Sequence, residues 1–131
     1  METVSEHLYG LLDTVRALRS DQGCPWDRRQ SPQTIRKYLL AECTELVAAI
    51  DKADPENTCE ELGDLLYIII MLTEIHADRG DFVLAEVIAG INAKLIRRHP
   101  HVFAGQSYSS EAELAEQWQA IKAQEKKKNS N

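Results

Sequence analysis

Apolar residues recur every three or four positions along most of the chain, which is the spacing of one face of an α-helix. In the first such stretch they are Val4, Leu8, Leu11, Leu12, Val15 and Leu18. The stretch ends at a turn-rich run, Ser-Asp-Gln-Gly, over residues 20–23. The pattern predicts a helix over residues 4–19 and a loop over residues 24–31.

Two later stretches begin with a helix-start signal of the same kind. Ser31 and Asp54 can each accept a hydrogen bond from a free N–H of the first turn, and each is followed by proline. The apolar spacing after them predicts helices from residue 32 to about Lys52 and from residue 55 to about Arg79. Gly80 is suited to the left-handed position after the second of these helices.

The remaining chain carries two more helical patterns. One starts near Asp81 and ends before Pro100, and the other opens with a capping box at Ser110 and runs to about Gln124. Lys126 to Asn131 are polar and basic, and we expect them to be disordered. The predicted organisation is therefore one domain over residues 1–125 and a disordered basic tail over residues 126–131.

The run from Leu65 to Leu72 is apolar on every side. Alone it is compatible with a buried strand, but its flanks contain no turn signal and continue the helical pattern. A helix that is apolar all round needs neighbours on all sides, and few helices are available in so short a chain. We therefore expect an all-α antiparallel bundle of four to five helices whose core is completed by dimerisation.

Composition and charge argue against several classes of function. The chain has 131 residues and a formal net charge of −6, which suits one globular domain and argues against binding a nucleic acid polymer. Its longest apolar run is far short of the ~18–20 residues of a membrane span. The cysteines, an odd number without a CxxC pair, favour a cytoplasmic protein with reduced thiols. Residues 1–93 hold 17 acids against 8 Lys and Arg, whereas residues 94–131 hold 7 Lys and Arg against 4 acids.

Four acids in the first part share a geometric relation. Glu42 and Glu45 lie three residues apart on one predicted helix, and Glu61 and Asp64 do so on the next. A short turn centred on Ala53 makes these helices antiparallel neighbours. Residues equally far from that turn lie level, so Glu45 should lie near Glu61, and Glu42 near Asp64.

Four close carboxylates repel one another, so they must protonate, point outward or bind cations. Mg²⁺ prefers such oxygen ligands, and Mn²⁺ is a second candidate. The alternative, that these are ordinary surface acids, stays open from the spacing alone. Gly63, a glycine in a helix interior, suggests a need for close approach beside them.

The basic part offers groups that bind phosphate. Lys94 and Arg98 share a helix face, with Arg97 beside them, and Trp118 and Lys122 share another. An arginine fork binds two phosphate oxygens at once, and tryptophan stacks on nucleobases. The alternatives are a helix C-terminal charge for Arg97 and a core position for Trp118.

Five segments resemble the MazG-type nucleoside triphosphate pyrophosphohydrolases in sequence and in order. They are Gly23-Cys24-Pro25-Trp26-Asp27, Leu39–Glu45, Glu60–Leu66, Lys94–Phe103 and Trp118–Lys122. The resemblance covers roughly residues 5–125. It implies an all-α fold completed by dimerisation, with Glu42, Glu45, Glu61 and Asp64 as metal ligands and catalytic residues.

The resemblance also implies an activity: Mg²⁺-dependent hydrolysis of the α–β phosphoanhydride of (deoxy)nucleoside triphosphates, giving a monophosphate and pyrophosphate. House-cleaning or control of the nucleotide pool is the role it suggests. Lys94, Arg98, Trp118 and Lys122 fall where the family contacts nucleotide. One departure is Ala41, which stands where the family's EExxE motif has its first glutamate. This departure keeps open a nucleotide-binding or regulatory helical module with little or no catalysis, and beyond it a pure interaction bundle.

Overall fold

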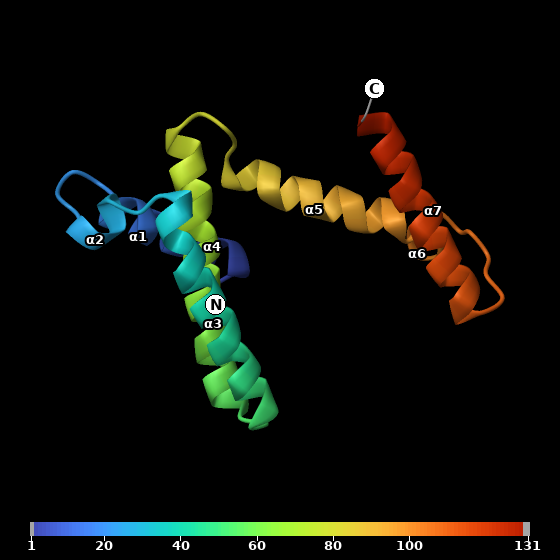
Figure 1. Cartoon of the computed structure of the whole chain (residues 1–131), viewed down its shortest axis with the longest axis horizontal. Coiled ribbons are helices and arrows are strands. Elements are labelled where there is room, and N and C mark those ends of the chain that lie inside the picture. The colour runs from blue at the N-terminus through green and yellow to red at the C-terminus, as the bar shows by residue number, and fades with distance from the viewer. Residues whose placement is uncertain (1, 130–131) are drawn as a thin grey trace. The chain divides into compact units, whose positions relative to one another are not determined.

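The computed structural model describes residues 2–129, and every regular element in that range is a helix (Figure 1). The helices are α1 (Val4–Leu18), α2 (Pro25–Arg28), α3 (Pro32–Asp51), α4 (Pro55–Asp78), α5 (Leu84–Arg98), α6 (Pro100–Phe103) and α7 (Glu111–Asn129). The prediction of an all-α fold is confirmed. The chain divides into two compact units between Leu84 and Ala85, called here the N-terminal and the C-terminal unit.

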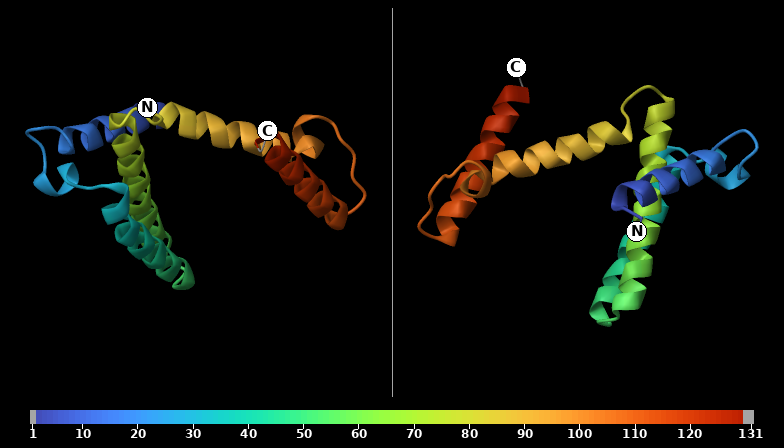
Figure 2. Two further views of the ribbon diagram at one scale, coloured as in Figure 1. Left: turned by 45° about the horizontal axis from the view of Figure 1, so that its top comes forward. Right: turned by 180° about the vertical axis from the view of Figure 1, so that it is seen from behind.

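The N-terminal unit is built on the hairpin of α3 and α4, which lie side by side along their length (Figures 1 and 2). Ser31 accepts a hydrogen bond from the backbone N–H of Thr34, and Asp54 accepts one from Asn57, so both predicted caps are present. A turn containing Ala53, with φ of 51°, joins the two helices. The antiparallel hairpin expected from the short turn is therefore present.

The end of α4 also follows its sequence signal. Gly80 has a φ of 76°, and its N–H donates to the carbonyl of Ala77 at 3.0 Å. The N–H of Asp81 donates to the carbonyl of His76 at 3.0 Å. These two bonds form the Schellman arrangement, which satisfies carbonyl groups at the end of the helix.

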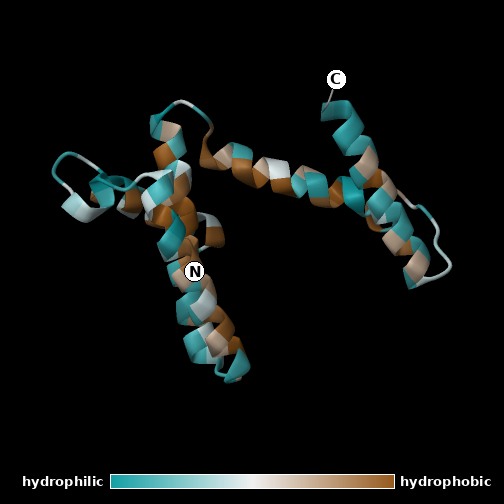
Figure 3. Cartoon of the chain, viewed as in Figure 1, coloured by the Kyte–Doolittle hydropathy of each residue, from teal (hydrophilic) through white to brown (hydrophobic). Residues whose placement is uncertain are grey.

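The core of the N-terminal unit lies where α1 packs on the later turns of α4. Its buried apolar side chains are Leu12, Val15, Ile35, Ile68, Ile70, Met71 and Ile75. Nearer the hairpin turn, Leu66 and Ile69 of α4 stay 41% exposed, and Figure 3 shows hydrophobic positions along this hairpin. Helices α1 and α3 therefore cover only part of α4, and completion of the core by a second copy stays a prediction.

The C-terminal unit contains α5, α6 and α7, and none of these helices has a fully buried residue. Ser110 accepts a hydrogen bond from the N–H of Glu113 at 3.2 Å, and the carboxylate of Glu113 accepts one from the N–H of Ser109 at 2.9 Å. The predicted capping interaction at the start of α7 is therefore present. Its reciprocal bond reaches Ser109, one residue before the expected position.

Four elements differ from the sequence prediction. Two expected loops contain the one-turn helices α2 and α6, each opened by a proline at its first position; four residues are too few to show an apolar period. Helix α5 begins at Leu84 instead of near Asp81. Helix α7 continues past Gln124 to Asn129, because basic side chains are favourable at the negative end of a helix dipole. Of the expected disordered tail, residues 130–131 lie outside the described part.

Over the described residues, no helix combines the length and the apolar content that crossing a membrane requires.

The segment that contains α2 is fixed to the hairpin by its own side chains. The hydroxyl of Tyr67 donates to the carboxylate of Asp27, which is buried. Arg19 donates to the carbonyl of Asp27 at 2.7 Å, and the rings of Trp26 and Tyr38 meet edge to face at 5.0 Å. These contacts hold α2 on the same hairpin that carries the paired acids.

The backbone of residues 17 and 18 passes so close to Gly23 that no side chain fits there. A Cβ atom there would lie 2.3 Å from the carbonyl oxygens of both Ala17 and Leu18. We therefore expect Gly23→Ala to lower the free energy of unfolding by about 2 kcal/mol, because the backbone must shift to admit a methyl group. The measurement is urea denaturation followed by circular dichroism.

The matched control is Gly10→Ala in the interior of α1, where a Cβ would meet nothing within 4 Å. This variant should be more stable by about 0.5–1 kcal/mol, the usual gain of alanine over glycine in a helix. Equal stability of Gly23→Ala and the unchanged protein would contradict the steric argument.

Candidate functional site

Four carboxylates converge between α3 and α4. Each of Glu42, Glu45, Glu61 and Asp64 offers an oxygen, and these oxygens all lie within 4.8 Å of one another. We call these residues the acidic cluster. The spacing of three residues on each helix puts each pair on one face, and the turn at Ala53 brings the two pairs level. The structure thus brings together the four acids that the sequence selected.

The sequence suggests a close approach at Gly63. A Cβ atom at Gly63 would meet nothing within 4 Å. No close approach by the described residues therefore requires glycine there, and the suggestion drawn from this residue stays a prediction. The convergence of the carboxylates follows from helix phase and the turn alone.

The electrostatics of the cluster differ from those of isolated surface acids. Burial, and after it the negative charges of Glu45 and Asp64, raises the pKa of both Glu42 and Glu61. One carboxylate oxygen of Glu42 and one of Glu61 are buried without a hydrogen-bond partner. Buried polar atoms normally have partners, so these two oxygens are available to a ligand.

The donor set fits a hard divalent cation. All four residues supply carboxylate oxygens, the ligands that Mg²⁺ and Mn²⁺ prefer. Among the ion pairs of the described residues, none involves a member of the acidic cluster. The charge of the cluster is therefore not neutralised by the Lys and Arg side chains of these pairs, and a metal ion would neutralise it.

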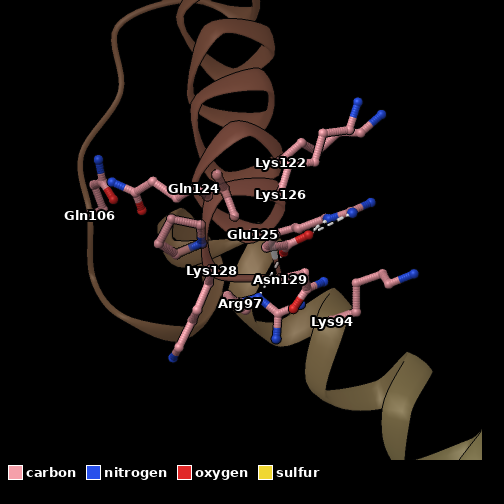
Figure 4. A pocket seen from close by; sticks show the side chains of 12 residues that line it. Lys94, Arg97, Gln106, Lys122, Gln124, Glu125, Lys126, Lys128 and Asn129 are labelled. Atoms are coloured by element: carbon pink, nitrogen blue, oxygen red, sulfur yellow. Dashed lines mark hydrogen bonds and ion pairs between the residues drawn. The ribbon is translucent and has the colours of Figure 1, made fainter. Parts of the chain in front are cut away.

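The predicted phosphate-binding residues gather in the C-terminal unit. Lys94, Arg97, Arg98 and Lys122 line one open pocket of about 900 Å³ between α5 and α7, here called the basic pocket (Figure 4). Lys126 and Lys128 line it as well. The structure thus brings these four predicted residues together, as a phosphate-binding role requires.

A carboxylate, Glu125, lies inside the basic pocket. It accepts a hydrogen bond from Nε of Arg97 at 2.7 Å and one from Nη2 of Arg98 at 2.8 Å. Arg98, and with it Arg97, lowers the pKa of Glu125 to about 2. The alternative for Arg97 was a charge at the C-terminal end of a helix, and Arg97 does lie in the last turn of α5. Its side chain, however, is hydrogen-bonded to Glu125.

Trp118 lies in the wall of a second pocket and not in a core. Its side chain is partly buried, and the guanidinium carbon of Arg98 lies 5.3 Å from the centre of its ring. The ring of His99 meets it edge on at 5.1 Å. Arg98, His99, His101 and Trp118 line this pocket together with residues of α7. Arg98 is thus shared by the basic pocket and the tryptophan pocket.

Sequence reasoning missed Glu125 and the contact of His99 with Trp118. Glu125 follows Lys122 by three residues and Trp118 by seven, so the helical period places all three on one face. That signal was present. An acid is not expected in a pocket that binds an anion, however, so Glu125 was not among the predicted phosphate-binding residues.

Residues 30–103 match the family model described as the MazG nucleotide pyrophosphohydrolase domain. The chain is 45% identical over 121 residues to the nucleoside triphosphate pyrophosphohydrolase/pyrophosphatase MazG of Thermotoga maritima, covering 90% of this chain and 45% of that protein. It is 38% identical over 117 residues to the nucleoside triphosphate pyrophosphohydrolase of Escherichia coli K12, covering 88% of this chain and 44% of that protein. The chain thus spans less than half the length of these curated relatives.

A solved structure has the same fold. The crystal structure of a mazG-related protein from Thermotoga maritima superposes with a TM-score of 0.72 at 29% sequence identity. The similarity covers 88% of this chain and 98% of that one. The all-helical arrangement is therefore shared with a protein of nearly matching extent.

The raised pKa of Glu61 makes the stability of the metal-free protein depend on pH. A carboxyl whose pKa is raised by folding stabilises the folded state fully below its unfolded pKa, ordinarily 4.5, and loses that contribution as pH rises through the folded value. We therefore expect Glu61→Gln to melt at a higher temperature than the unchanged protein near pH 7 in chelator. The gain should vanish near about pH 4, where the native carboxyl is itself protonated.

The control is Glu60→Gln, which removes the same charge from the neighbouring exposed residue outside the acidic cluster. It should change the melting temperature little at either pH. A melting temperature of Glu61→Gln below that of the unchanged protein at pH 7 in chelator would contradict the repulsion in the cluster.

Proposed function

Because the chain belongs to the MazG nucleotide pyrophosphohydrolase family, we propose that it hydrolyses (deoxy)nucleoside triphosphates at the α–β phosphoanhydride, with Mg²⁺ as cofactor. The products are a nucleoside monophosphate and pyrophosphate. The observation that carries the proposal is the acidic cluster, with its four oxygens within 4.8 Å and two of its buried oxygens unpartnered. Curated relatives named nucleoside triphosphate pyrophosphohydrolases support it.

In this mechanism the acidic cluster holds the metal. When bound, Mg²⁺ supplies charge neutralisation on the triphosphate and lowers the pKa of a water. Glu45 or Glu42 accepts the proton of the attacking water, since a carboxylate within hydrogen-bond reach acts as a general base. Glu61 and Asp64 complete the ligand set from α4. Mn²⁺ is the expected substitute, because it takes the same oxygen ligands.

The residues of the C-terminal unit bind the substrate. Lys94, Arg97, Arg98 and Lys122 stabilise the negative charge of the phosphates, and the arginine forks each bind two oxygens. Trp118 offers a ring on which a nucleobase stacks. Their common position around two pockets that share Arg98 supports this division between phosphate and base.

We further propose a setting for this activity. The exposed apolar positions of α4 support a homodimer, and the free cysteines support a cytoplasmic location. Control of the nucleotide pool, including removal of unwanted nucleotides, is the role that a freely acting triphosphate pyrophosphohydrolase would serve.

The activity is tested by measuring pyrophosphate release from the eight common nucleoside and deoxynucleoside triphosphates, and from damaged ones, with Mg²⁺ or Mn²⁺. We expect release with at least one substrate and none in chelator. Glu61→Gln should reduce kcat by about 10³-fold or more, because it removes a metal ligand. Glu60→Gln, which removes the same charge one residue away, should keep kcat within about twofold.

If no substrate releases pyrophosphate, the proposed activity is wrong. Full activity in Glu61→Gln would instead contradict the assignment of the acidic cluster as the metal-binding site, without contradicting the activity itself. Circular dichroism of both variants shows that the fold is retained.

A second candidate function is supported by Ala41, which is exposed on α3 directly before Glu42. Without the glutamate that the family has at this position, the chain would be a nucleotide-binding or regulatory module with little catalysis. Calorimetry separates the two functions: nucleotide binding with Mg²⁺ but without pyrophosphate release would favour this one. Turnover that rises in Ala41→Glu would show that the residue limits the rate of an enzyme.

A further inference from the structure

The basic pocket contains one group of the wrong sign for an anion site. Among the described residues, six Lys and Arg side chains and one carboxylate, that of Glu125, line it. The pair of Glu125 and Arg98 is partly buried, with side chains 18% and 16% exposed, whereas the side chain of Arg97 is 50% exposed. Figure 4 shows Glu125 projecting from α7 into the group of basic side chains, with dashed lines to its partners. Its position requires an explanation beyond surface charge.

Glu125 fixes the orientation of two arginines at once. One of its oxygens accepts from Nε of Arg97 at 2.7 Å, and the other accepts from Nη2 of Arg98 at 2.8 Å. The guanidinium carbon of Arg98 also lies over the ring of Trp118, 5.3 Å from its centre. Arg98 is therefore hydrogen-bonded to Glu125 and in contact with Trp118, and both contacts restrict its side chain.

Free donors remain on both arginines in this arrangement. A guanidinium has five N–H donors, and Glu125 engages Nε and Nη2 of Arg98 but only Nε of Arg97. Within residues 2–129, no hydrogen bond engages Nη1 of Arg98 or the two Nη nitrogens of Arg97, so these groups can donate to another anion. Without the carboxylate between them, the two guanidinium groups would repel each other and move apart into solvent.

We propose that Glu125 is a positioning residue that preorganises Arg97 and Arg98 as a two-pronged clamp for a polyphosphate. The inference rests on the proposed function, because it assumes that the basic pocket receives the phosphates of the substrate. Holding both long side chains in place before binding removes part of the conformational entropy that the anion would otherwise have to overcome. The carboxylate thereby strengthens anion binding despite its own negative charge.

A competing role makes the opposite prediction. If Glu125 is a resident anion that the phosphate must displace, its removal frees the arginines and tightens binding. Simple charge arithmetic also predicts tighter binding, since Glu125→Gln removes a negative charge from the pocket. A loss of affinity in this variant therefore identifies positioning.

The experiment is calorimetric titration of inorganic tripolyphosphate into the full chain without divalent cations, so that the metal-free acidic cluster repels the anion. We expect Glu125→Gln to bind about tenfold more weakly than the unchanged protein. Glu125→Asp keeps the charge but is shorter by one methylene, so its affinity for tripolyphosphate should fall severalfold less than that of Glu125→Gln. Glu116→Gln, the same charge change at an exposed position of α7, should bind within about twofold of the unchanged protein.

The kinetic counterpart separates positioning from general damage. Glu125→Gln should raise KM for the nucleotide about tenfold while kcat stays within about twofold, because it removes uniform binding of the phosphates. Equal or tighter tripolyphosphate binding in Glu125→Gln overturns the inference and leaves the proposed activity standing. Failure of the unchanged protein to bind tripolyphosphate overturns the basic pocket as a phosphate site, and this inference with it. Should Glu125→Gln not fold, affinity of Glu125→Asp equal to that of the unchanged protein overturns the inference as well.

Discussion

The repulsion among four carboxylates is the constraint on which the rest of the N-terminal unit depends. Helix phase and a short turn force Glu42, Glu45, Glu61 and Asp64 together, and neither Lys nor Arg forms an ion pair with them among the described residues. The protein must therefore supply the stability of the hairpin elsewhere. It does so in the packed layer of α1 against α4, and through α2, which Tyr67 and Arg19 hold by Asp27.

The C-terminal unit handles its charges in the opposite way. There the crowding is of cations, and a carboxylate from the chain itself, Glu125, neutralises part of it with direct ion pairs. The acidic cluster has no counter-ion from the Lys and Arg side chains of the described ion pairs, whereas the basic side chains have Glu125. Under the proposed function, a metal ion would neutralise the acids, as Glu125 neutralises part of the basic charge.

Local rules were enough to predict the helices and the acidic cluster. Ser31 and Asp54 carry their own cap chemistry, and the level placement of Glu45 with Glu61 needs only the turn position. The sequence could not predict α2 and α6, since one turn shows no period. Nor could it predict the pairing of Glu125 with Arg97 and Arg98, which lie 28 and 27 residues away along the chain. Such pairings depend on how α7 packs on α5, which local patterns do not encode.

If the acidic cluster holds a metal ion as proposed, metal binding would also stabilise the hairpin. The core takes its α3 and α4 members from Ile35 and from the stretch Ile68 to Ile75, on one side of the acidic cluster. Toward the turn Ala49 is buried, but the larger side chains of Val47, Ile50 and Leu62 stay more than half exposed. The mutually repelling carboxylates therefore lie in the part of the hairpin where apolar packing between α3 and α4 contributes least. A divalent cation would convert that repulsion into attraction between α3 and α4 and so fasten the part of the hairpin that the core does not reach. The same four side chains that would carry the chemistry thus also determine whether this end of the hairpin is held closed.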